Sequence, residues 1–351
     1  LLFRRQIMIQ RPINEGGRLW TPSPAVIEDA NLTRYLRWLR SERRLDFPSY
    51  AALWQWSVTE IEAFWASMWD YFAVVSSKPY HAVLMERKMP GAQWFVGAEL
   101  NFAENIFQRS TSERPALLTC SETDPLSAIS WQDLYTRTAN LAHALRSLGV
   151  GQGDRVAGYL PNIPEALVAV LACASIGAIW SSCSPDFGSR GVLDRFAQIE
   201  PKLLIAVAGY PYGGKAFDRR AIVAELQAGL PTLQRTILIE STAVTGQVVQ
   251  LAANTIGWRE LMGNERGDAP LTFAQVPFDH PLWILYSSGT TGLPKPIVQG
   301  HGGILLEHAK ATALHNDLKA GDRFFWYPST GWMMWNYLVG SLLSGCTAIL
   351  Y

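Results

Sequence analysis

The chain has 351 residues, of which 48% are hydrophobic and 17% are charged, and its formal net charge at pH 7 is zero. This composition predicts a globular protein with enough apolar residues for two or three domains, and it excludes a disordered chain. The balanced charge leaves neither a basic footprint nor an acidic tail, so we expect no nucleic-acid partner.

The cysteines do not form a metal or redox motif. Cys120, Cys173, Cys183 and Cys346 show no CxxC spacing and no accompanying histidine cluster, so they indicate no zinc site. Free thiols in a reducing compartment are favoured over disulfides. We therefore expect a cytoplasmic protein.

The first 110 residues have the character of an N-terminal extension. Residues 31–43 place apolar side chains at helical spacing with arginines on the opposite face, which predicts a helix. Residues 57–61 offer an N-cap for a following aromatic helix. We expect residues 1–110 to pack as a cap on a larger core domain formed by residues 111–351.

From residue 115 onward, short apolar segments alternate with amphipathic ones. Strands are predicted over 116–120, 129–131, 155–159, 178–182, 203–208 and 236–239, and helices over 132–148, 163–176 and 191–200. The alternation predicts an α/β fold of mostly parallel sheets layered with helices and joined by right-handed crossovers.

One apolar segment has the length of a membrane span. Residues 166–185 carry no charge, but Gly177, four serines and Pro185 interrupt them. This pattern favours a buried helix followed by a strand. Residues 1–11 contain no apolar stretch long enough for a secretory signal. We therefore expect no membrane insertion.

The most informative segment follows a further predicted strand, residues 282–286. This segment consists of six small, uncharged residues, namely Ser287, Ser288, Gly289, Thr290, Thr291 and Gly292. Glycines allow close approach of the backbone to a ligand, and successive N–H groups in such a turn bind anions. Lys295, between two prolines, adds a point charge for phosphate. A phosphate-binding loop is therefore favoured over an ordinary hydroxyl-rich turn.

This loop differs from a Walker P-loop, in which Gly-Lys-Ser/Thr opens a helix. Instead, residues 286–295 resemble the signature loop of the acyl-adenylate-forming enzymes, which include acyl-CoA synthetases, luciferases and adenylation domains of peptide synthetases. Pro296 replaces the glycine that usually follows the lysine in that family. Residues 184–188, 192–202 and 98–105 resemble the acetoacetate-activating branch more than the acetate- or propionate-activating branches.

The resemblance implies a two-step reaction. The carboxylate of acetoacetate attacks the α-phosphorus of ATP to give an acyl-adenylate and pyrophosphate, and the thiol of CoA then displaces AMP. ATP, Mg²⁺ and CoA are therefore expected, with acetoacetate, ATP and CoA as the small-molecule partners. Residues 287–292 would cradle the phosphates, with Lys295 and Thr290 as catalytic residues. No metal-ligand cluster is visible, and the family's Mg²⁺ carboxylate would lie beyond residue 351.

The resemblance also implies a substrate pocket lined by His301, Trp332, Met333 and Met334. Acetate-using relatives carry a small β-branched pair after that tryptophan, so two methionines imply a different cavity with adaptable walls. A structural role for His301 and a core role for the aromatic segment remain open alternatives. Lys215 is a candidate contact for the phosphates of CoA, with a solvated basic turn as the alternative.

The family's adenine-binding segment, hinge and small C-terminal domain are not found in this sequence. We therefore expect the chain to be the N-terminal part of a longer enzyme, with an incomplete large domain, and to be inactive by itself. The alternatives are a synthetase for another short acid, such as propionate or butyrate, and a non-catalytic nucleotide-binding remnant.

Overall fold

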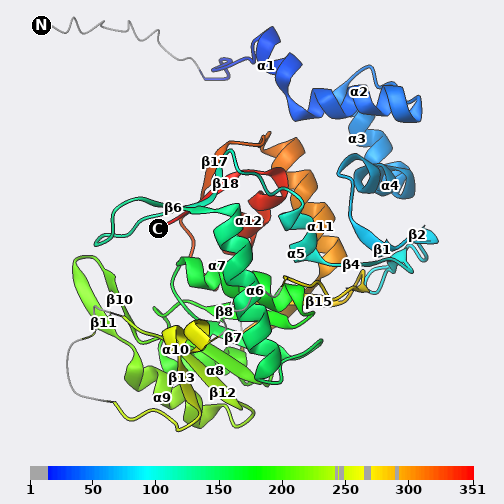
Figure 1. The fold of residues 1–351 in the computed structure, drawn as a ribbon. Coiled ribbons are helices and arrows are strands. Elements are labelled where there is room, and N and C mark those ends of the chain that lie inside the picture. Colours follow the sequence, from blue (N-terminus) through cyan, green and yellow to red (C-terminus); the bar gives the residue numbers. More distant parts are fainter. Residues whose placement is uncertain (1–14, 242–243, 245–248, 265–269, 289–291) are drawn as a thin grey trace, which may run out of the picture.

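A computed structural model describes residues 15–241, 244, 249–264, 270–288 and 292–351, and Figure 1 shows how they are arranged. Two main sheets, one of seven and one of four strands, are layered with helices. A helical region at the N-terminal end lies beside these layers (Figure 1). This confirms the predicted α/β class with mostly parallel sheets.

The seven-stranded sheet is the centre of the molecule. In spatial order it consists of β13 (Thr255–Gly257), β12 (Arg235–Ile239), β9 (Leu203–Val207), β7 (Arg155–Tyr159), β8 (Ile179–Cys183), β15 (Pro281–Ser287) and β16 (Lys295–Gly300). Its neighbours are parallel except for β15 and β16, which form an antiparallel hairpin. Every residue of β9 is buried, as expected for a strand covered on both faces.

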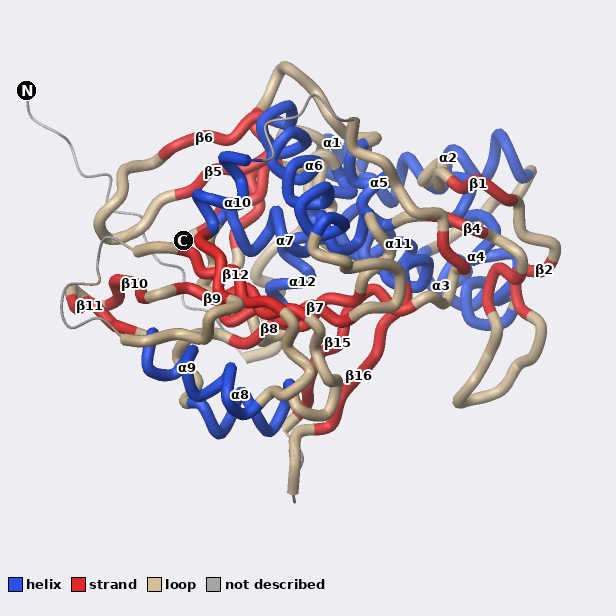
Figure 2. Tube along the Cα trace, turned by 60° about the horizontal axis from the view of Figure 1, so that its bottom comes forward, coloured by secondary structure: helices blue, strands red, loops and turns tan. Residues whose placement is uncertain are grey.

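Helices cover both faces of this sheet (Figure 2). On one side lie α8 (Ser189–Phe196) and α9 (Arg220–Gly229), and on the other lie α6 (Trp131–Ser147), α7 (Pro164–Ser175) and α10 (Trp258–Asn264). In α7, residues 166–175 are all buried, so the uncharged segment is a core helix followed by β8, as predicted. Among the described residues, no helix is both long and apolar enough to span a membrane.

The four-stranded sheet lies beyond α6 and α7. Its strands, in order, are β17 (Arg323–Phe325), β18 (Thr347–Leu350), β5 (Pro115–Thr119) and β6 (Ser127–Ser130). β17, β18 and β5 run parallel, and β5 and β6 form an antiparallel hairpin. Next to this sheet are α11 (His301–Lys310), a π-helical turn (Ala311–His315), α12 (Met333–Gly340) and a 3₁₀ turn (Ser341–Ser344).

The N-terminal region is helical and aromatic. It comprises α1 (Pro24–Asp29), α2 (Asn31–Arg43), α3 (Tyr50–Thr59), α4 (Ile61–Tyr71), α5 (Phe102–Phe107), β1 (Ser76–Lys78), β2 (Ala82–Leu84), β3 (Trp94–Val96) and β4 (Glu99–Leu100). β4 pairs with β14 (Val276–Pro277), which attaches this region to the rest of the molecule.

The N-cap expected within residues 57–61 is Glu60, and Ser57 does not cap the helix. Ser57 lies in the last turn of α3, where its hydroxyl donates to the carbonyl of Trp54 at 2.7 Å. The helix that follows begins after Glu60, which makes no side-chain cap bond. A serine near a helix end can bond backward to the preceding turn as well as forward, and the local sequence does not distinguish these cases.

Strand β16, which pairs with β15, was not predicted from the sequence, and neither was the separate hairpin of β10 (Gly209–Tyr212) and β11 (Lys215–Asp218). Pro296 and Pro211 lie inside these strands, and proline is depleted in strands except at edges. β16 is the edge strand of the described sheet, where a missing N–H is tolerated.

Candidate functional site

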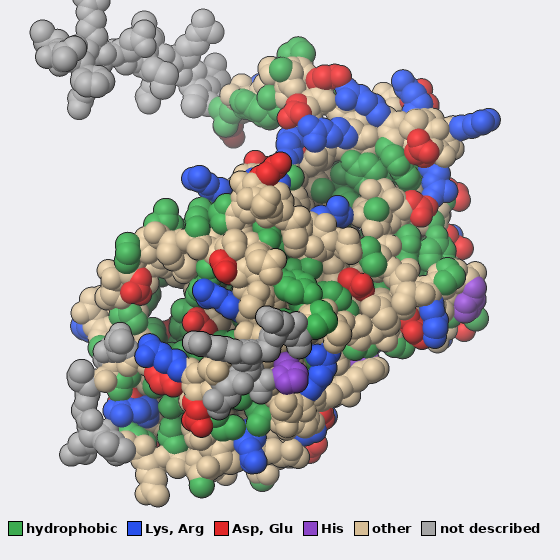
Figure 3. Space-filling view, in the orientation of Figure 1, with side chains coloured by type: hydrophobic (Ala, Val, Ile, Leu, Met, Phe, Trp, Pro, Cys, Tyr) green, Lys and Arg blue, Asp and Glu red, His purple; other side chains and the backbone are tan. Residues whose placement is uncertain are grey.

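A cavity of about 610 Å³ lies where the two main sheets face each other at the carboxyl ends of their parallel strands. Figure 3 shows the molecule hollowed at this place, between the β5–β6 and β10–β11 hairpins. The cavity is lined by residues directly after β5, β7, β8 and β18, among them Cys120, Pro161, Ser184 and Tyr351. In open α/β sheets, ligands bind in crevices at these strand ends.

One wall contains a hydrogen-bonded carboxylate. Asp186 accepts from the hydroxyls of Ser184 at 2.8 Å and Tyr210 at 2.6 Å. Arg219 donates to the Tyr210 hydroxyl at 3.2 Å and lies over the Tyr210 ring. Burial, and then the bond to Asp186, raise the pKa of Tyr210. The wall therefore presents an ordered carboxylate and a neutral phenol.

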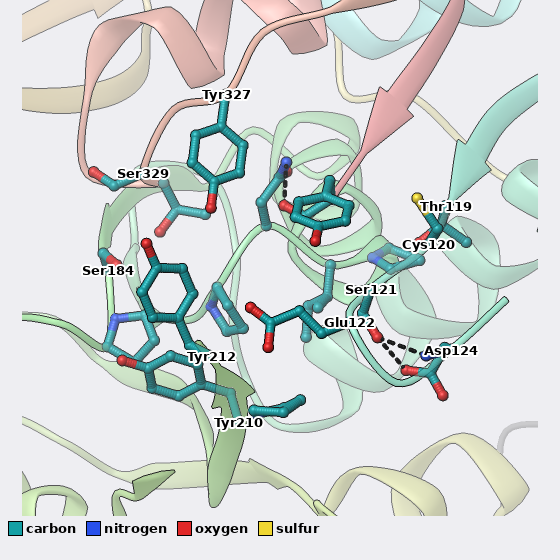
Figure 4. A pocket seen from close by; sticks show the side chains of 18 of the residues that line it. Thr119, Cys120, Ser121, Glu122, Asp124, Ser184, Tyr210, Tyr212, Tyr327 and Ser329 are labelled. Atoms are coloured by element: carbon teal, nitrogen blue, oxygen red, sulfur yellow. Dashed lines mark hydrogen bonds between the residues drawn. The ribbon is translucent and has the colours of Figure 1, made fainter. Parts of the chain in front are cut away.

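The opposite wall is the segment from Tyr327 to Thr330, which follows β17. The Thr330 hydroxyl donates to the carbonyl of Leu160 at 2.5 Å, and the Ser182 hydroxyl donates to the carbonyl of Thr330 at 2.6 Å. These two bonds join the segment to the ends of β7 and β8. Ser329 therefore has a fixed place on the cavity wall (Figure 4).

The cavity is acidic and rich in tyrosine. Its lining includes Glu122, Asp124, Glu165 and Asp186, and none of the described residues that line it is lysine, arginine or histidine. The tyrosines on its walls are Tyr210, Tyr212, Tyr327 and Tyr351. An anionic ligand would therefore need its counter-charge from outside this lining.

The predicted phosphate loop begins one strand away from the cavity. β15 runs parallel to β8, so Ser287 and Ser288 leave the sheet at the same edge as Ser184. Lys295 is exposed, begins β16 and is the ladder partner of Ser287. Gly292 has φ +99°, a conformation that favours glycine. Gly289, Thr290 and Thr291 lie outside the described residues.

Lys215 stands at the tip of the β10–β11 hairpin, opposite Tyr212 in the ladder, and is exposed. It does not line the cavity, although Tyr212 does. The nearby Arg220 forms an ion pair with Asp218 at 2.7 Å. Among the described lysines and arginines of this hairpin and of the start of α9, Lys215 thus lies at the hairpin tip.

The structure places His301 in the core and not on the cavity. Its side chain is fully buried, and its Nδ1 accepts the backbone N–H of Phe102 at 3.2 Å. Burial, with a smaller effect of His280, lowers the pKa of His301 to about 3. A neutral histidine that accepts a backbone bond at the start of α11 fits the structural alternative.

Trp332, Met333 and Met334 lie at the beginning of α12, beyond the Ser329 wall. Trp332 is 54% exposed and Met333 is 45% exposed, whereas Met334 is half-buried. None of the three lines the described cavity. Glu122 and Asp186, which do line it, were not selected as site residues from the sequence. The signal that could have found them is their position directly after predicted parallel strands.

Two family models match the chain. The one described as "AMP-binding enzyme" covers residues 104–351, and the one described as "Acetyl-coenzyme A synthetase N-terminus" covers residues 50–106. The chain belongs to the AMP-binding enzyme family. This confirms the resemblance of the loop sequence to the acyl-adenylate-forming enzymes.

Several members of this family are similar to the chain almost from end to end. The acetoacetyl-coenzyme A synthetase of Rhizobium meliloti is 41% identical over 95% of this chain, and the acetoacetyl-CoA synthetase of Gallus gallus is 39% identical over 97%. A malonamoyl-CoA synthetase of Penicillium aethiopicum is 36% identical over 97%. The chain covers 51%, 51% and 48% of these relatives, so it spans about half of their length.

Among solved structures, the acetoacetyl-CoA synthetase of Streptomyces lividans superposes with a TM-score of 0.89. It is 51% identical, and the match covers 95% of this chain and 51% of that one. The similarity therefore extends to the arrangement of both sheets as well as to the sequence.

Proposed function

We propose that the chain is part of an AMP-forming acetoacetate–CoA ligase. The observation that carries the proposal is the position of Ser287 and Lys295, which are ladder partners at the sheet edge that also carries the cavity. The names of the Rhizobium, Gallus and Streptomyces relatives support acetoacetate as the acid.

In the first step, a carboxylate oxygen of the acid bonds to the α-phosphorus of ATP, and the bond to the β-phosphate breaks to release pyrophosphate. Charge gathers on the departing phosphates, so donors and a cation placed there accelerate the step. Residues 287–292 would supply N–H and hydroxyl donors, with Lys295 as the cation and Thr290 as a catalytic donor. In the second step, the sulfur of CoA bonds to the acyl carbon, AMP leaves, and the thiol proton is released.

The acidic cavity suits a different part of the reaction from the phosphate loop. Its carboxylates would repel the triphosphate, which favours placing the phosphates over the β15–β16 hairpin. We propose that Trp332, Met333 and Met334 border the acid, and that Lys215 contacts the phosphates of CoA. His301 would act indirectly, by fixing the start of α11 behind the loop.

Mg²⁺ is expected with ATP in this family, but the residues of the described ranges do not fit a protein-bound metal. They contain no group of three or more His, Cys, Asp or Glu side chains able to hold an ion. We therefore assign Mg²⁺ no ligand among the residues that the structure describes.

For the domains, we propose residues 1–110 as a cap packed on a core of residues 111–351. The pairing of β4 with β14 and the hydrogen bonds from Asn101 to Ala174 and Ala274 support this packing. We also propose a cytoplasmic location, supported by the four cysteines, which are all free thiols.

The test is acid-dependent exchange between ATP and pyrophosphate, measured on the full-length protein with acetoacetate, acetate, propionate, butyrate and malonamate. Strongest exchange with acetoacetate is the expected result. Strongest exchange with another acid would keep the adenylation chemistry and overturn the substrate. No exchange with any acid would favour the non-catalytic nucleotide-binding alternative.

A further inference from the structure

Two hairpins from different sheets meet at the mouth of the cavity. Glu122 belongs to the connection between β5 and β6, and its carboxylate accepts the backbone N–H of Gly213 at 2.7 Å and of Gly214 at 2.8 Å. These glycines form the two-residue loop between β10 and β11. The contact joins two segments that are about 90 residues apart in the chain, and Glu122 and the neighbouring Tyr212 both line the cavity.

The glycine turn is shaped to present both donors. Gly213 has φ +60° and Gly214 has φ +69°, which is the pattern of a type I′ hairpin turn. Tyr212 and Lys215 flank the turn as ladder partners. Both N–H groups thus point to a single acceptor outside the hairpin, and the Glu122 carboxylate occupies that position.

The acidic side of the contact is ordered as well. The Ser121 hydroxyl donates to the Asp124 carboxylate at 2.7 Å and accepts the N–H of Asp124 at 3.0 Å and of Thr123 at 3.2 Å. In Figure 4, Asp124 is held beside Ser121, whereas Glu122 points the other way, toward the tyrosines. The turn therefore directs Glu122, and not Asp124, toward the opposite hairpin.

A pair of tyrosines lies at the same mouth. Tyr212, next to the glycine turn, and Tyr327 both line the cavity, and the rings of Tyr327 and Tyr351 lie 5.9 Å apart. Burial, and then the neighbouring Tyr212 side chain, raise the pKa of Tyr327, so its phenol stays neutral near pH 7. The tip of the β10–β11 hairpin thus lies beside both neighbouring walls.

We propose that Glu122 and the Gly213–Gly214 turn form a latch that narrows the mouth of the cavity and opens reversibly to admit a ligand. This latch concerns access to the cavity and does not depend on which molecule fills it. Bonds from a carboxylate to backbone N–H groups are short and directional, which suits closure. The carboxylate is exposed, so water can replace both donors, which suits release.

The fold lets one side of the latch move. Among the described residues, β10 and β11 form a two-stranded sheet of their own. Its base is anchored, because Tyr210 is buried and donates to Asp186, whereas residues 212–215 at its tip are exposed, so the tip is the part that can move. The two glycine N–H groups lower the pKa of Glu122, so the carboxylate stays charged and latched at neutral pH.

The cavity contains its own reporter of opening. Cys120 lines it and is half-buried, whereas Cys173, Cys183 and Cys346 are buried in the core. The alkylation rate of Cys120 can be followed on its own peptide by mass spectrometry. A bulky maleimide dye reports opening of the mouth. Iodoacetamide is the small reagent for comparison, because it enters the closed cavity more easily than the dye does.

The experiment compares the full-length wild-type protein with Glu122→Ala and Glu122→Gln. The dye should label Cys120 at least about threefold faster in Glu122→Ala, with Glu122→Gln between the two, because its amide oxygen still accepts one N–H. Iodoacetamide should show a smaller change. Glu113→Gln, which removes an exposed carboxylate near β5, is the matched control and should label like the wild type.

General unfolding would also expose Cys173 and Cys183. If both are labelled at the wild-type rate in the variant, the effect is local to the latch. Hydrogen exchange of residues 209–218 gives a second readout, and it should be faster in Glu122→Ala. Wild-type dye labelling of Cys120 together with wild-type exchange of that hairpin would overturn the latch. Because neither measurement uses catalysis, a failure of the ligase proposal would leave this test intact.

Discussion

Ser287 and Lys295 lie directly opposite each other in the antiparallel ladder between β15 and β16. Side chains of such partners project from the same face of a sheet, with their Cβ atoms about 5 Å apart. The hairpin therefore places the side chains of Ser287 and Lys295 on one face where the predicted phosphate loop leaves the sheet. This pairing assigns Lys295 a defined place relative to the loop.

Removing this ammonium group should impair adenylation more than binding of the acid. For Lys295→Ala we expect ATP–pyrophosphate exchange in the full-length protein to fall by about 100-fold, the typical loss of one group that stabilises developing charge. Lys295→Arg should retain more activity than the alanine variant. Lys88→Ala removes a lysine from the β2–β3 connection and should leave exchange unchanged. Equal rates for Lys295→Ala and wild type would contradict the assignment.

The two methionines after Trp332 should influence the choice of acid. Replacing them together, as Met333→Val with Met334→Thr, changes both volume and polarity where acetate-using relatives have a small β-branched pair. We expect the ratio of kcat/KM for acetoacetate to that for acetate to fall by about 10-fold or more. Met85→Val alters an exposed methionine elsewhere and should leave the ratio constant. A constant ratio in the double variant would place the acid elsewhere.

Asn101 should be one of the most sensitive polar positions for stability. Its buried amide donates to the carbonyls of Ala174 and Ala274, both at 2.8 Å, and its oxygen caps α5. Asn101→Ala should lower the free energy of unfolding by about 3 kcal/mol, because buried carbonyls lose their donors and a cap is lost. Urea denaturation measures this loss.

Ser130→Ala is the matched comparison, because Ser130 caps α6 from an exposed position. Loss of a cap alone should cost about 1 kcal/mol. Equal losses for Asn101→Ala and Ser130→Ala would show that the buried amide bonds add little.

The core histidines should make the fold sensitive to mild acid. Burial lowers the pKa of His301 to about 3 and that of His308 to about 4. As the pH falls below about 6.5, the unfolded chain binds protons that the folded chain does not, so stability decreases. Each histidine should contribute about 1.4 kcal/mol to the loss between pH 7.5 and pH 5.5.

His301→Asn provides the test, because an amide oxygen can still accept the N–H of Phe102 but does not titrate. The loss of unfolding free energy between these pH values should shrink by about 1.4 kcal/mol in this variant. An unchanged loss in His301→Asn would mean that the histidine is accessible to protons.

Local sequence patterns predicted the elements whose own residues show a clear hydrophobic pattern. The helix over 31–43 has the predicted bounds, and β7 occupies 155–159 as expected. The structure also contains the helix and the strand predicted within residues 166–185. An uncharged segment that is interrupted by a glycine and a proline favours such a pair in the core. β16 and β10 were not predicted because each contains a proline, which argues against a strand unless the strand lies at an edge. Local sequence does not show which strands lie at an edge.

The sequence by itself determined the fold class and the family, since these follow from short-range periodicity and a contiguous motif, and the same motif predicts a phosphate loop with Lys295. Only the tertiary structure decided that Glu122 reaches Gly213 and Gly214, that Asp186 faces the cavity, and that His301 is buried. These relationships depend on strand order, because neighbours such as β5 and β18 are distant in the chain. Such pairing is set by the burial of apolar faces across the whole molecule, which no local pattern records.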